Sequence, residues 1–355
     1  MSSRSLSHLK QIILTYFLRP IAKTLLLISI SGYVLFALVF SQKPLYAQET
    51  DAYITALDFN SAVGKYAAGY SDWTVRIWDA ETGKLHHTMQ PPDIPRDPAS
   101  ALYATSSLVF SPNGDKLAVS FKGDVSRNLI IILDTSTGET LLEISGIPDI
   151  TTLDWSPDGN FLAGVYVYNP LTRSRSYLAV WNTETGEELN QHELSEASSL
   201  SLDWHPVESR LAYTASTQVV VWDVDKWQEE YTLTADEIGT TSVAWNPTGD
   251  RLASVGAEGV VRIWNSETGE LETEIRTDNT EKSYPNVFWN TDGSFVGINH
   301  GKRIKIWDAS TGALTFSDET PEIITGIILK PDGDILYSSK DIETLETTLP
   351  DFSGK

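Results

Sequence analysis

The sequence predicts an all-β fold, a seven-bladed β-propeller of four-stranded blades preceded by one N-terminal hydrophobic helix. Two recurring patterns lead to the propeller: an apolar strand followed by a Thr-Gly turn, and a tight hairpin turn rich in Pro and Gly. An uncharged apolar run near the N-terminus leads to the helix. The chain is therefore divided into an N-terminal segment, 1–47, and a repeat domain, 48–355.

The first recurring pattern is an apolar strand that ends in Trp and runs into a Thr-Gly turn. Successive copies place Trp181, Trp222, Trp264 and Trp307 at spacings of 41, 42 and 43 residues. That period matches the ~40–45 residues of a four-stranded propeller blade. Counting two weaker copies, six such segments occur, among them TVRIWDAETGKL, LAVWNTETGEEL, VVRIWNSETGEL and RIKIWDASTGAL.

The second recurring pattern is a hairpin turn between two alternating apolar strands. Pro and Gly at fixed positions favour a tight turn at this point. Copies of the pattern include FSPNGDKLAV, WSPDGNFLAG and WNPTGDRLAS, with looser versions such as FNSAVGKYAAG and WHPVESRLAY. Seven turns of this kind occur, and each is expected to open one blade.

Nine of the eleven tryptophans occupy equivalent positions in these repeats. Large aromatic side chains at strand spacing fill the space between stacked sheets, so all nine are expected in the core. They are Trp78, Trp155, Trp181, Trp204, Trp222, Trp245, Trp264, Trp289 and Trp307.

These segments resemble the WD-repeat family, and YAAGYSDWTVRIWD (Tyr66 to Asp79) follows its blade pattern almost position by position. The resemblance extends over about Ile54 to Leu349. It implies a ring closed by a strand from before the first blade, so the last blade is expected to be incomplete or completed by the N-terminal segment. The chain departs from the family in having no Gly-His pair, and the aspartate of the family's buried network is matched only at Asp72, with Glu258 a near relative.

The N-terminal apolar run, Thr24 to Phe40, suits export or membrane attachment. Its 17 residues exceed a signal-peptide core of about 7–15 and only reach the lower limit of the ~17–25 that span a bilayer. A cleaved signal peptide and a retained anchor both remain open, whereas a buried core helix is disfavoured because such helices rarely lack a polar face. Four basic residues before the run, against Lys43 alone after it, predict a cytoplasmic N-terminus and an extracytoplasmic propeller.

Composition and motifs argue against several functions. Beyond residue 47 the chain has 21 basic against 48 acidic residues, so nucleic acid is not an expected partner and the membrane is contacted only through the N-terminal segment. There is no cysteine, the histidines lack metal-ligand spacing, and His205 merely replaces the serine of a Ser-Pro-x-Gly turn. With no catalytic motif either, we expect no cofactor and no enzyme.

The predicted function is therefore a non-catalytic protein-interaction scaffold of the cell envelope, acting as a monomeric propeller. The alternative is a propeller-fold hydrolase or lyase with a site in the central channel, where polar side chains of distant blades can converge.

A partner site is expected where loops are longest. The family places the turn between the second and third strands, and the links between blades, on one face called the top. The length of the second-to-third-strand turn is measured from the glycine of the hairpin turn to the Trp, or its Leu equivalent, of the strand pattern. This separation is 14 residues from Gly64 to Trp78, but 19 from Gly114 to Leu133 and 22 from Gly159 to Trp181. The Pro-rich link 90–103 adds a third enlarged loop. The proposed partner-binding residues in and beside these loops are Trp73, Arg96, Arg127, Tyr166, Tyr168, Arg173, Arg175 and Tyr177.

Arginines among aromatic residues are typical of protein-binding surfaces, and guanidinium groups suit carboxylates. The expected partner is a protein or peptide, an acidic one fitting best, docked over the first three blades. The alternative that these arginines only balance nearby acids stays open.

Overall fold

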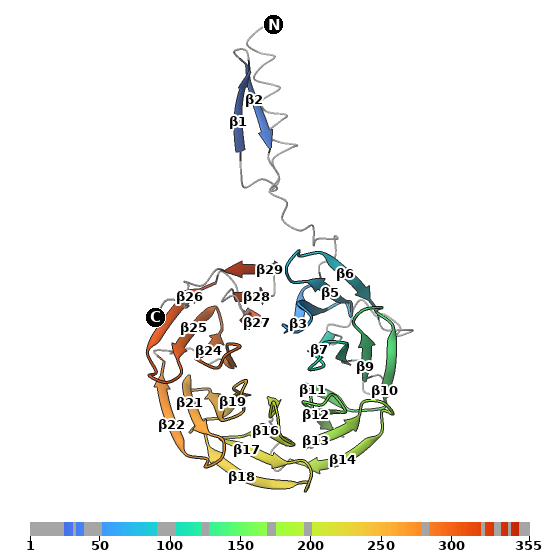
Figure 1. Cartoon of the computed structure of the whole chain (residues 1–355), viewed down its shortest axis with the longest axis vertical. Coiled ribbons are helices and arrows are strands. Elements are labelled where there is room, and N and C mark those ends of the chain that lie inside the picture. The colour runs from blue at the N-terminus through green and yellow to red at the C-terminus, as the bar shows by residue number, and fades with distance from the viewer. Residues whose placement is uncertain are drawn as a thin grey trace. The chain divides into compact units, whose positions relative to one another are not determined.

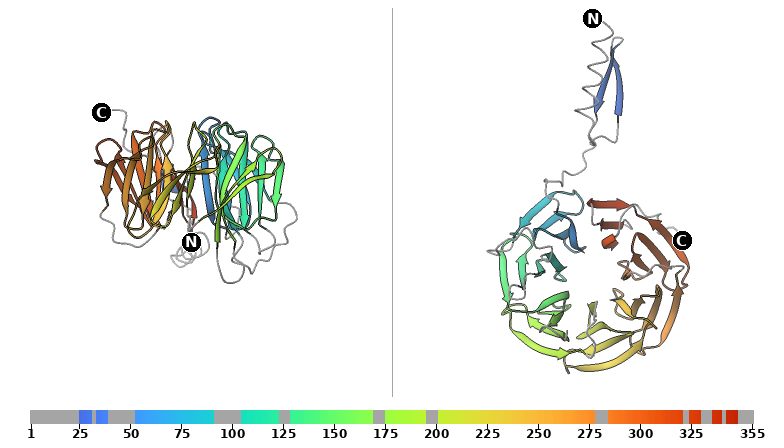
Figure 2. Two further views of the ribbon diagram at one scale, coloured as in Figure 1. Left: turned by 90° about the horizontal axis from the view of Figure 1, so that it is seen from below. Right: turned by 180° about the vertical axis from the view of Figure 1, so that it is seen from behind.

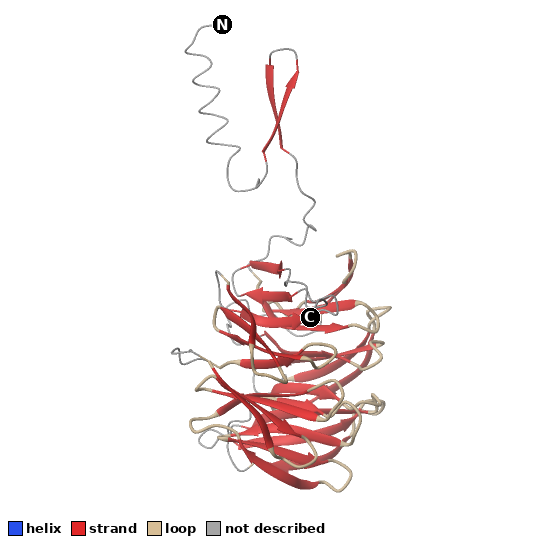
Figure 3. Ribbon diagram, turned by 60° about the vertical axis from the view of Figure 1, so that its left-hand side comes forward, coloured by secondary structure: helices blue, strands red, loops and turns tan. Residues whose placement is uncertain are grey.

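The computed structural model of the chain describes residues 25–30, 33–38, 52–90, 104–122, 128–168, 175–194, 201–277, 284–320, 324–329, 335–339 and 342–347. The chain divides into two compact units, Met1–Glu49 and Thr50–Lys355. Within the described ranges every regular element is a β-strand (Figure 3).

The described part of the first unit is a β-hairpin. Strands β1 (Leu25–Ile30) and β2 (Tyr33–Leu38) pair antiparallel, with Leu25 opposite Leu38 and Ile30 opposite Tyr33. The prediction of an N-terminal hydrophobic helix is therefore wrong for these residues. The run includes β-branched and aromatic residues such as Ile28, Val34 and Phe36, which favour extended backbone. Cross-strand pairing satisfies the backbone groups that a helix would satisfy internally.

No helix among the described residues has the length and apolar character needed to cross a membrane.

The second unit contains six antiparallel four-stranded blades arranged around an axis, with the first strand of each blade innermost (Figure 1). The first three blades are β3 (Ile54–Asn60), β4 (Lys65–Tyr70), β5 (Val75–Asp79) and β6 (Leu85–Met89); β7 (Ala104–Phe110), β8 (Lys116–Lys122), β9 (Leu129–Asp134) and β10 (Thr140–Ser145); and β11 (Asp149–Trp155), β12 (Phe161–Tyr168), β13 (Arg175–Asn182) and β14 (Glu188–Glu193). The next three are β15 (Leu202–Trp204), β16 (Arg210–Ala215), β17 (Gln218–Asp223) and β18 (Gln228–Thr234); β19 (Thr240–Trp245), β20 (Arg251–Gly256), β21 (Val260–Asn265) and β22 (Leu271–Arg276); and β23 (Asn286–Trp289), β24 (Phe295–His300), β25 (Arg303–Asp308) and β26 (Leu314–Glu319).

The prediction of seven four-stranded blades is also wrong. The remaining strands, β27 (Ile324–Leu329), β28 (Ile335–Ser339) and β29 (Ile342–Thr347), form a three-stranded sheet whose first strand lies beside β3 (Figure 1). A full blade needs a hairpin between its third and fourth strands, and the Thr-Gly pattern that makes this hairpin occurs six times. Counting the other turn, which occurs seven times, overestimated the number of blades.

The outer hairpins explain the Asp that directly follows the Trp of the strand pattern, as at Asp308, or its Leu equivalent, as at Asp134. Oδ1 of Asp134 accepts the backbone N–H groups of Ser136 and Thr137, each at 2.8 Å, and Asp308 accepts those of Ser310 and Thr311. Bonds from the adjacent serine hydroxyls, together with these N–H groups, hold the pKa of both carboxyls down at about 2. The carboxylate at this position therefore stabilises its own exposed turn.

The inner hairpins are held by a side chain at their first position. Ser111 Oγ and Asn246 Oδ1 accept the N–H groups of Lys116 and Arg251, at 2.9 and 3.0 Å. His205 stands at the same position, as predicted. Its Nδ1 accepts the N–H of Glu208 at 2.9 Å, and its Nε2 lies 3.0 Å from the carbonyl oxygen of Gly249 in the next blade.

The apolar core lies between neighbouring blades. Eight of the nine repeat tryptophans are buried, Trp289 being only partly so, which confirms the core prediction for those eight. Val261 and Ile275 of the fifth blade, for example, share one cluster with Ile298 of the sixth. Each blade thus buries its faces against its neighbours.

The innermost strands are also joined by hydrogen bonds at one repeated position, the residue directly before the aromatic residue near the end of each strand. Where that position is Asp, its carboxyl accepts the backbone N–H of an aromatic residue in the next blade. The three such bonds are Phe110 to Asp58, 2.7 Å; Trp204 to Asp154, 2.6 Å; and Trp245 to Asp203, 2.5 Å.

Where the same position is apolar, the next blade still donates the hydrogen bond, but a different donor and acceptor form it. At Val109 and Ala244 the backbone carbonyl accepts the indole N–H of the next blade's Trp155 and Trp289, each at 3.0 Å. Five consecutive blade junctions are therefore joined through the same aromatic position by one of two hydrogen bonds.

Candidate functional site

Turns between second and third strands lie at the same end of the blades as the links between blades. Backbone bonds join Ser71 N–H to the Tyr53 carbonyl at 2.9 Å, Ala257 to Gly239 at 2.8 Å and Thr320 to Lys302 at 2.6 Å. We call this end the top face. The left view of Figure 2 shows the blades edge-on, with their strands running between the top face and the opposite face.

The predicted partner-binding residues divide into three groups. Arg96, Arg127 and Arg173 lie outside the described residues. Trp73 is buried and packs against Phe121 of the second blade, with ring centroids 6.2 Å apart, so its indole belongs to the core between two blades. The structure brings together only the residues of the third blade, on β12 and β13: Tyr166, Tyr168, Arg175 and Tyr177.

Two cross-strand pairs make up this third-blade group. Tyr166 stands opposite Tyr177 with the rings stacked at 5.3 Å, and Tyr168 stands opposite Arg175. Tyr166 is buried and receives a hydrogen bond from Gln191, whereas Tyr168 is 50% exposed. Tyr166 is therefore not available at the surface, Tyr177 is half-buried, and Tyr168 and Arg175 are exposed.

The charge of Arg175 is partly offset. Its guanidinium lies 3.2 Å from Oε2 of Glu193, and the hydroxyl of Tyr177 is 3.5 Å from the same oxygen. For Arg175 this geometry agrees with the alternative that the arginines balance nearby acids. A partner-binding role for the group stays a prediction.

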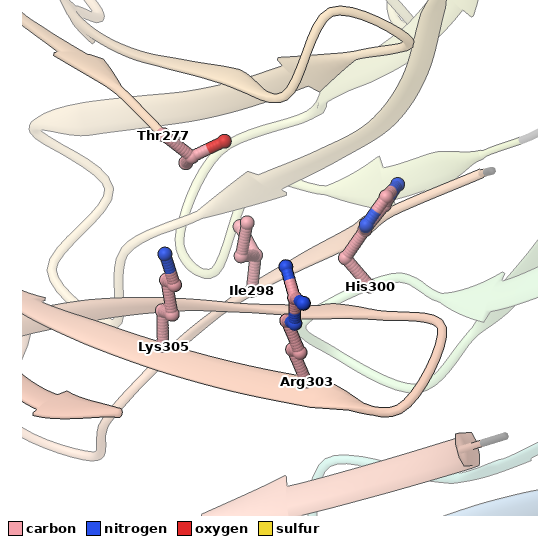
Figure 4. Close-up of a pocket in the computed structure, with 5 residues that line it drawn as sticks. All are labelled: Thr277, Ile298, His300, Arg303 and Lys305. Atoms are coloured by element: carbon pink, nitrogen blue, oxygen red, sulfur yellow. The ribbon is translucent and has the colours of Figure 1, made fainter. Parts of the chain in front are cut away.

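A pocket that sequence reasoning missed opens at the top of the junction between the fifth and sixth blades. It encloses about 220 Å³ of empty space, including its open mouth, and is lined by Thr277, Ile298, His300, Arg303 and Lys305 (Figure 4). Sequence reasoning looked for long loops, and the turn between β24 and β25 is short. The available signal was the alternation of basic residues Arg303 and Lys305 on one face of a strand.

A second hollow, between the first and second blades, is larger. Its empty space is about 480 Å³, again including open solvent, and its lining includes Val75, Met89, Phe121 and Leu133. Its lining contains no charged side chain, whereas that of the pocket of the sixth blade contains Arg303 and Lys305.

The carboxyls on the innermost strands have raised pKa values. Asp58, Asp154 and Asp203 are half-buried on the innermost strands. Burial raises the pKa of Asp58 to about 7, against an ordinary value of 3.8, despite the opposing bond from the Phe110 N–H.

Asp154 and Asp203 are hydrogen-bonded to each other, and burial raises the pKa of both. Two carboxyls in contact cannot both ionise easily, so the pair retains a proton that isolated carboxyls would lose. Each also accepts an N–H from the next blade, which gives the pair a structural role. Within the described ranges no three potential metal-ligating side chains cluster together.

Comparison with known families finds two matches. Residues 203–292 match the family described as the anaphase-promoting complex subunit 4 WD40 domain, and residues 42–79 match the WD domain, G-beta repeat. The matches and the fold support a WD-repeat propeller. A comparison with curated proteins finds no match.

The two matched ranges each include an inner carboxyl, Asp203 in one and Asp58 in the other. The WD-repeat family models thus match part of the first blade and parts of the fourth to sixth blades.

The raised pKa of Asp58 predicts an acid-favoured contribution to stability. The folded protein holds this proton more tightly than the unfolded chain, so the stabilisation is present at low pH and is lost as pH rises from about 4 through about 7. Asn at position 58 keeps an acceptor oxygen for Phe110 but does not titrate. We therefore expect Asp58→Asn to lose less unfolding free energy than wild type between about pH 5 and about pH 8, measured by urea titration.

Asp134→Asn is the matched control, because Asp134 is ionised throughout this range. That variant should be destabilised to a similar extent at both pH values. An Asp58→Asn variant whose stability changes with pH as steeply as that of wild type would contradict the assignment.

Proposed function

We propose that this WD-repeat propeller is a non-catalytic interaction scaffold that binds a protein or peptide partner on its top face. The observation that carries the proposal is the exposure of large apolar side chains on two successive blade links. Ile238, between β18 and β19, is 65% exposed, and Tyr284, between β22 and β23, is 76% exposed. Exposed apolar side chains on a rigid rim support binding to another protein.

The third blade adds a further exposed aromatic at the same face. Tyr168 ends β12, and Arg175 begins β13 directly opposite it. An exposed tyrosine beside an arginine has the composition of an interface anchor, and a rigid β-scaffold lets such residues bind with little loss of conformational entropy.

We also propose an extracytoplasmic location, with the N-terminal segment responsible for export or membrane attachment. The support is the uncharged run Thr24 to Phe40 and the basic residues that precede it. Protease added to intact spheroplasts should then digest the propeller. Protection of the propeller until the cells are lysed would contradict this location.

The binding proposal is tested by partner capture with two charge-reversal variants of equal net charge. One carries Arg127→Glu, Arg173→Glu and Arg175→Glu, in and beside the enlarged loops. The other carries Lys84→Glu, Lys116→Glu and Lys226→Glu, toward the opposite face. We expect the first variant to lose capture of a partner that wild type retains at moderate salt, because reversed charges repel an acidic partner.

The second variant should capture the partner as wild type does, and circular dichroism should show both variants folded. Equal capture by both variants would move the site away from the enlarged loops. Wild-type protein that captures no partner in any envelope fraction would contradict the scaffold function itself.

A further inference from the structure

The hollow between the first and second blades is explained by comparing equivalent blade junctions. In the third to sixth blades, the third strand carries a tryptophan near its end that packs against the preceding blade. These residues are Trp181, Trp222, Trp264 and Trp307. In the second blade the same position is Leu133, which packs against the first blade. Among these five junctions, one therefore lacks the indole that the other four contain.

Strand pairing supports this equivalence. Leu133 pairs with Leu117 of β8 in the same way that Trp181 pairs with Leu162 of β12. Both residues belong to buried clusters that include the preceding blade. The leucine thus faces the same part of its neighbour as the tryptophan does, but it has a smaller side chain.

Space remains beside this leucine. The hollow encloses about 480 Å³, including its mouth, and its buried lining consists of Val75, Phe121, Ile131 and Leu133. The ring of Phe121 also packs against Trp73, which holds this wall in place. An apolar hollow with fixed walls suits a rigid ring system better than a charged group.

The hollow extends along the junction to the top face. Gly138, in the turn between β9 and β10, lies at the end away from this face, whereas Phe121 is the penultimate residue of β8 and Gln90 directly follows β6. Strands β8 and β6 both end at the top, since a turn between second and third strands follows one and a link between blades follows the other. A partner docked on the top face over the first blades therefore has access to the hollow.

Two exposed threonines, Thr88 and Thr140, add hydroxyl groups to the lining. Thr140 pairs with Leu133 at the position where Glu188 pairs with Trp181 in the third blade. Burial raises the pKa of the Glu188 carboxyl, and a side-chain hydrogen bond from Trp181 opposes that shift. The hydroxyl of Thr140 thus stands where the third blade places an acceptor for its indole N–H.

We propose that the hollow between the first and second blades receives a tryptophan side chain of the partner. The proposal rests on the scaffold function and names the side chain that the partner presents. Four equivalent junctions contain an indole, and this junction offers an apolar lining and a hydroxyl acceptor where the indole is missing. A smaller side chain would leave part of the hollow unfilled and lose those contacts.

Met89 gives a direct measure of occupancy. The chain has two methionines, Met1 and Met89, and Met89 lines the hollow. Protein that is isotope-labelled in its methionine methyl groups is titrated with N-acetyl-tryptophanamide, an uncharged mimic of a tryptophan within a peptide. We expect a saturable shift of the Met89 methyl signal, because the ring current of an indole acts only at short range. The signal is assigned by its absence in Met89→Leu.

Leu133→Trp supplies the missing indole from the chain itself. We expect this variant to lose the titration, to displace the Met89 signal in the absence of ligand and to melt at a higher temperature, because it fills a cavity. The matched control is Leu141→Trp, which adds an indole at an exposed position of β10 and should leave the apparent affinity within about twofold of wild type.

Thr140→Val tests the hydroxyl without changing the shape of the lining. It should weaken the binding of N-acetyl-tryptophanamide by roughly fivefold, because one hydrogen bond is lost, and leave the binding of N-acetyl-phenylalaninamide unchanged. This exposed substitution and the wild-type titration do not depend on whether Leu133→Trp folds.

Absence of a saturable shift in wild type would overturn the proposal. An equal response of Leu133→Trp and Leu141→Trp would also overturn it, as would saturable binding of free indole without binding of N-acetyl-tryptophanamide. Partner capture by wild type remains a separate measurement, so failure of this tryptophan site is distinguishable from failure of the scaffold function.

Discussion

A four-stranded blade can bury its apolar faces only against neighbouring blades, so this propeller depends on how its inner strands are joined. At five consecutive junctions, an aromatic residue at the end of the innermost strand of one blade donates a hydrogen bond to the blade before it. Asp58, Asp154 and Asp203 supply a carboxyl where the backbone N–H is the donor, and a backbone carbonyl serves where the indole is the donor. Hydrogen bonds have direction, which apolar packing lacks, and they fix the register of one blade on the next.

The inner links involve residues of the innermost strands, whereas the proposed recognition takes place on the top face. Charged side chains at the opposite end, such as the turn aspartates Asp134 and Asp308, accept hydrogen bonds from their own hairpins. Between the blades, four junctions contain a tryptophan, while Leu133 leaves a hollow at the equivalent place. The difference between equivalent junctions is the kind of irregularity by which a repeated scaffold acquires a specific site.

The repeat period, the hairpin turns and the buried tryptophans could be predicted from sequence because each depends on local pattern. The number of four-stranded blades could not, since the inner hairpin occurs once more than the outer one and only the outer hairpin adds a fourth strand. The prediction for the apolar run that contains Leu25 to Leu38 was also wrong, because length and hydropathy do not distinguish a helix from a β-hairpin. The pocket needed the structure, since it depends on Thr277 and Lys305, which only blade packing brings together. The inner carboxyls left a visible signal, the Leu-Asp-Trp triplets that contain Asp154 and Asp203, but their depth in the ring does not follow from sequence.

Amide hydrogen exchange in Asp203→Ala tests most directly whether these inner links hold the blades together. Removing the carboxyl eliminates the bond to the Trp245 N–H and the contact with Asp154. The account predicts faster exchange throughout β19 and in the inner strands on either side, because blades joined in this way open together. Asp223→Ala, which removes a turn carboxyl of the same blade, should accelerate exchange only around the hairpin of β17 and β18. Exchange in β19 that is no faster in Asp203→Ala than in Asp223→Ala would contradict the account.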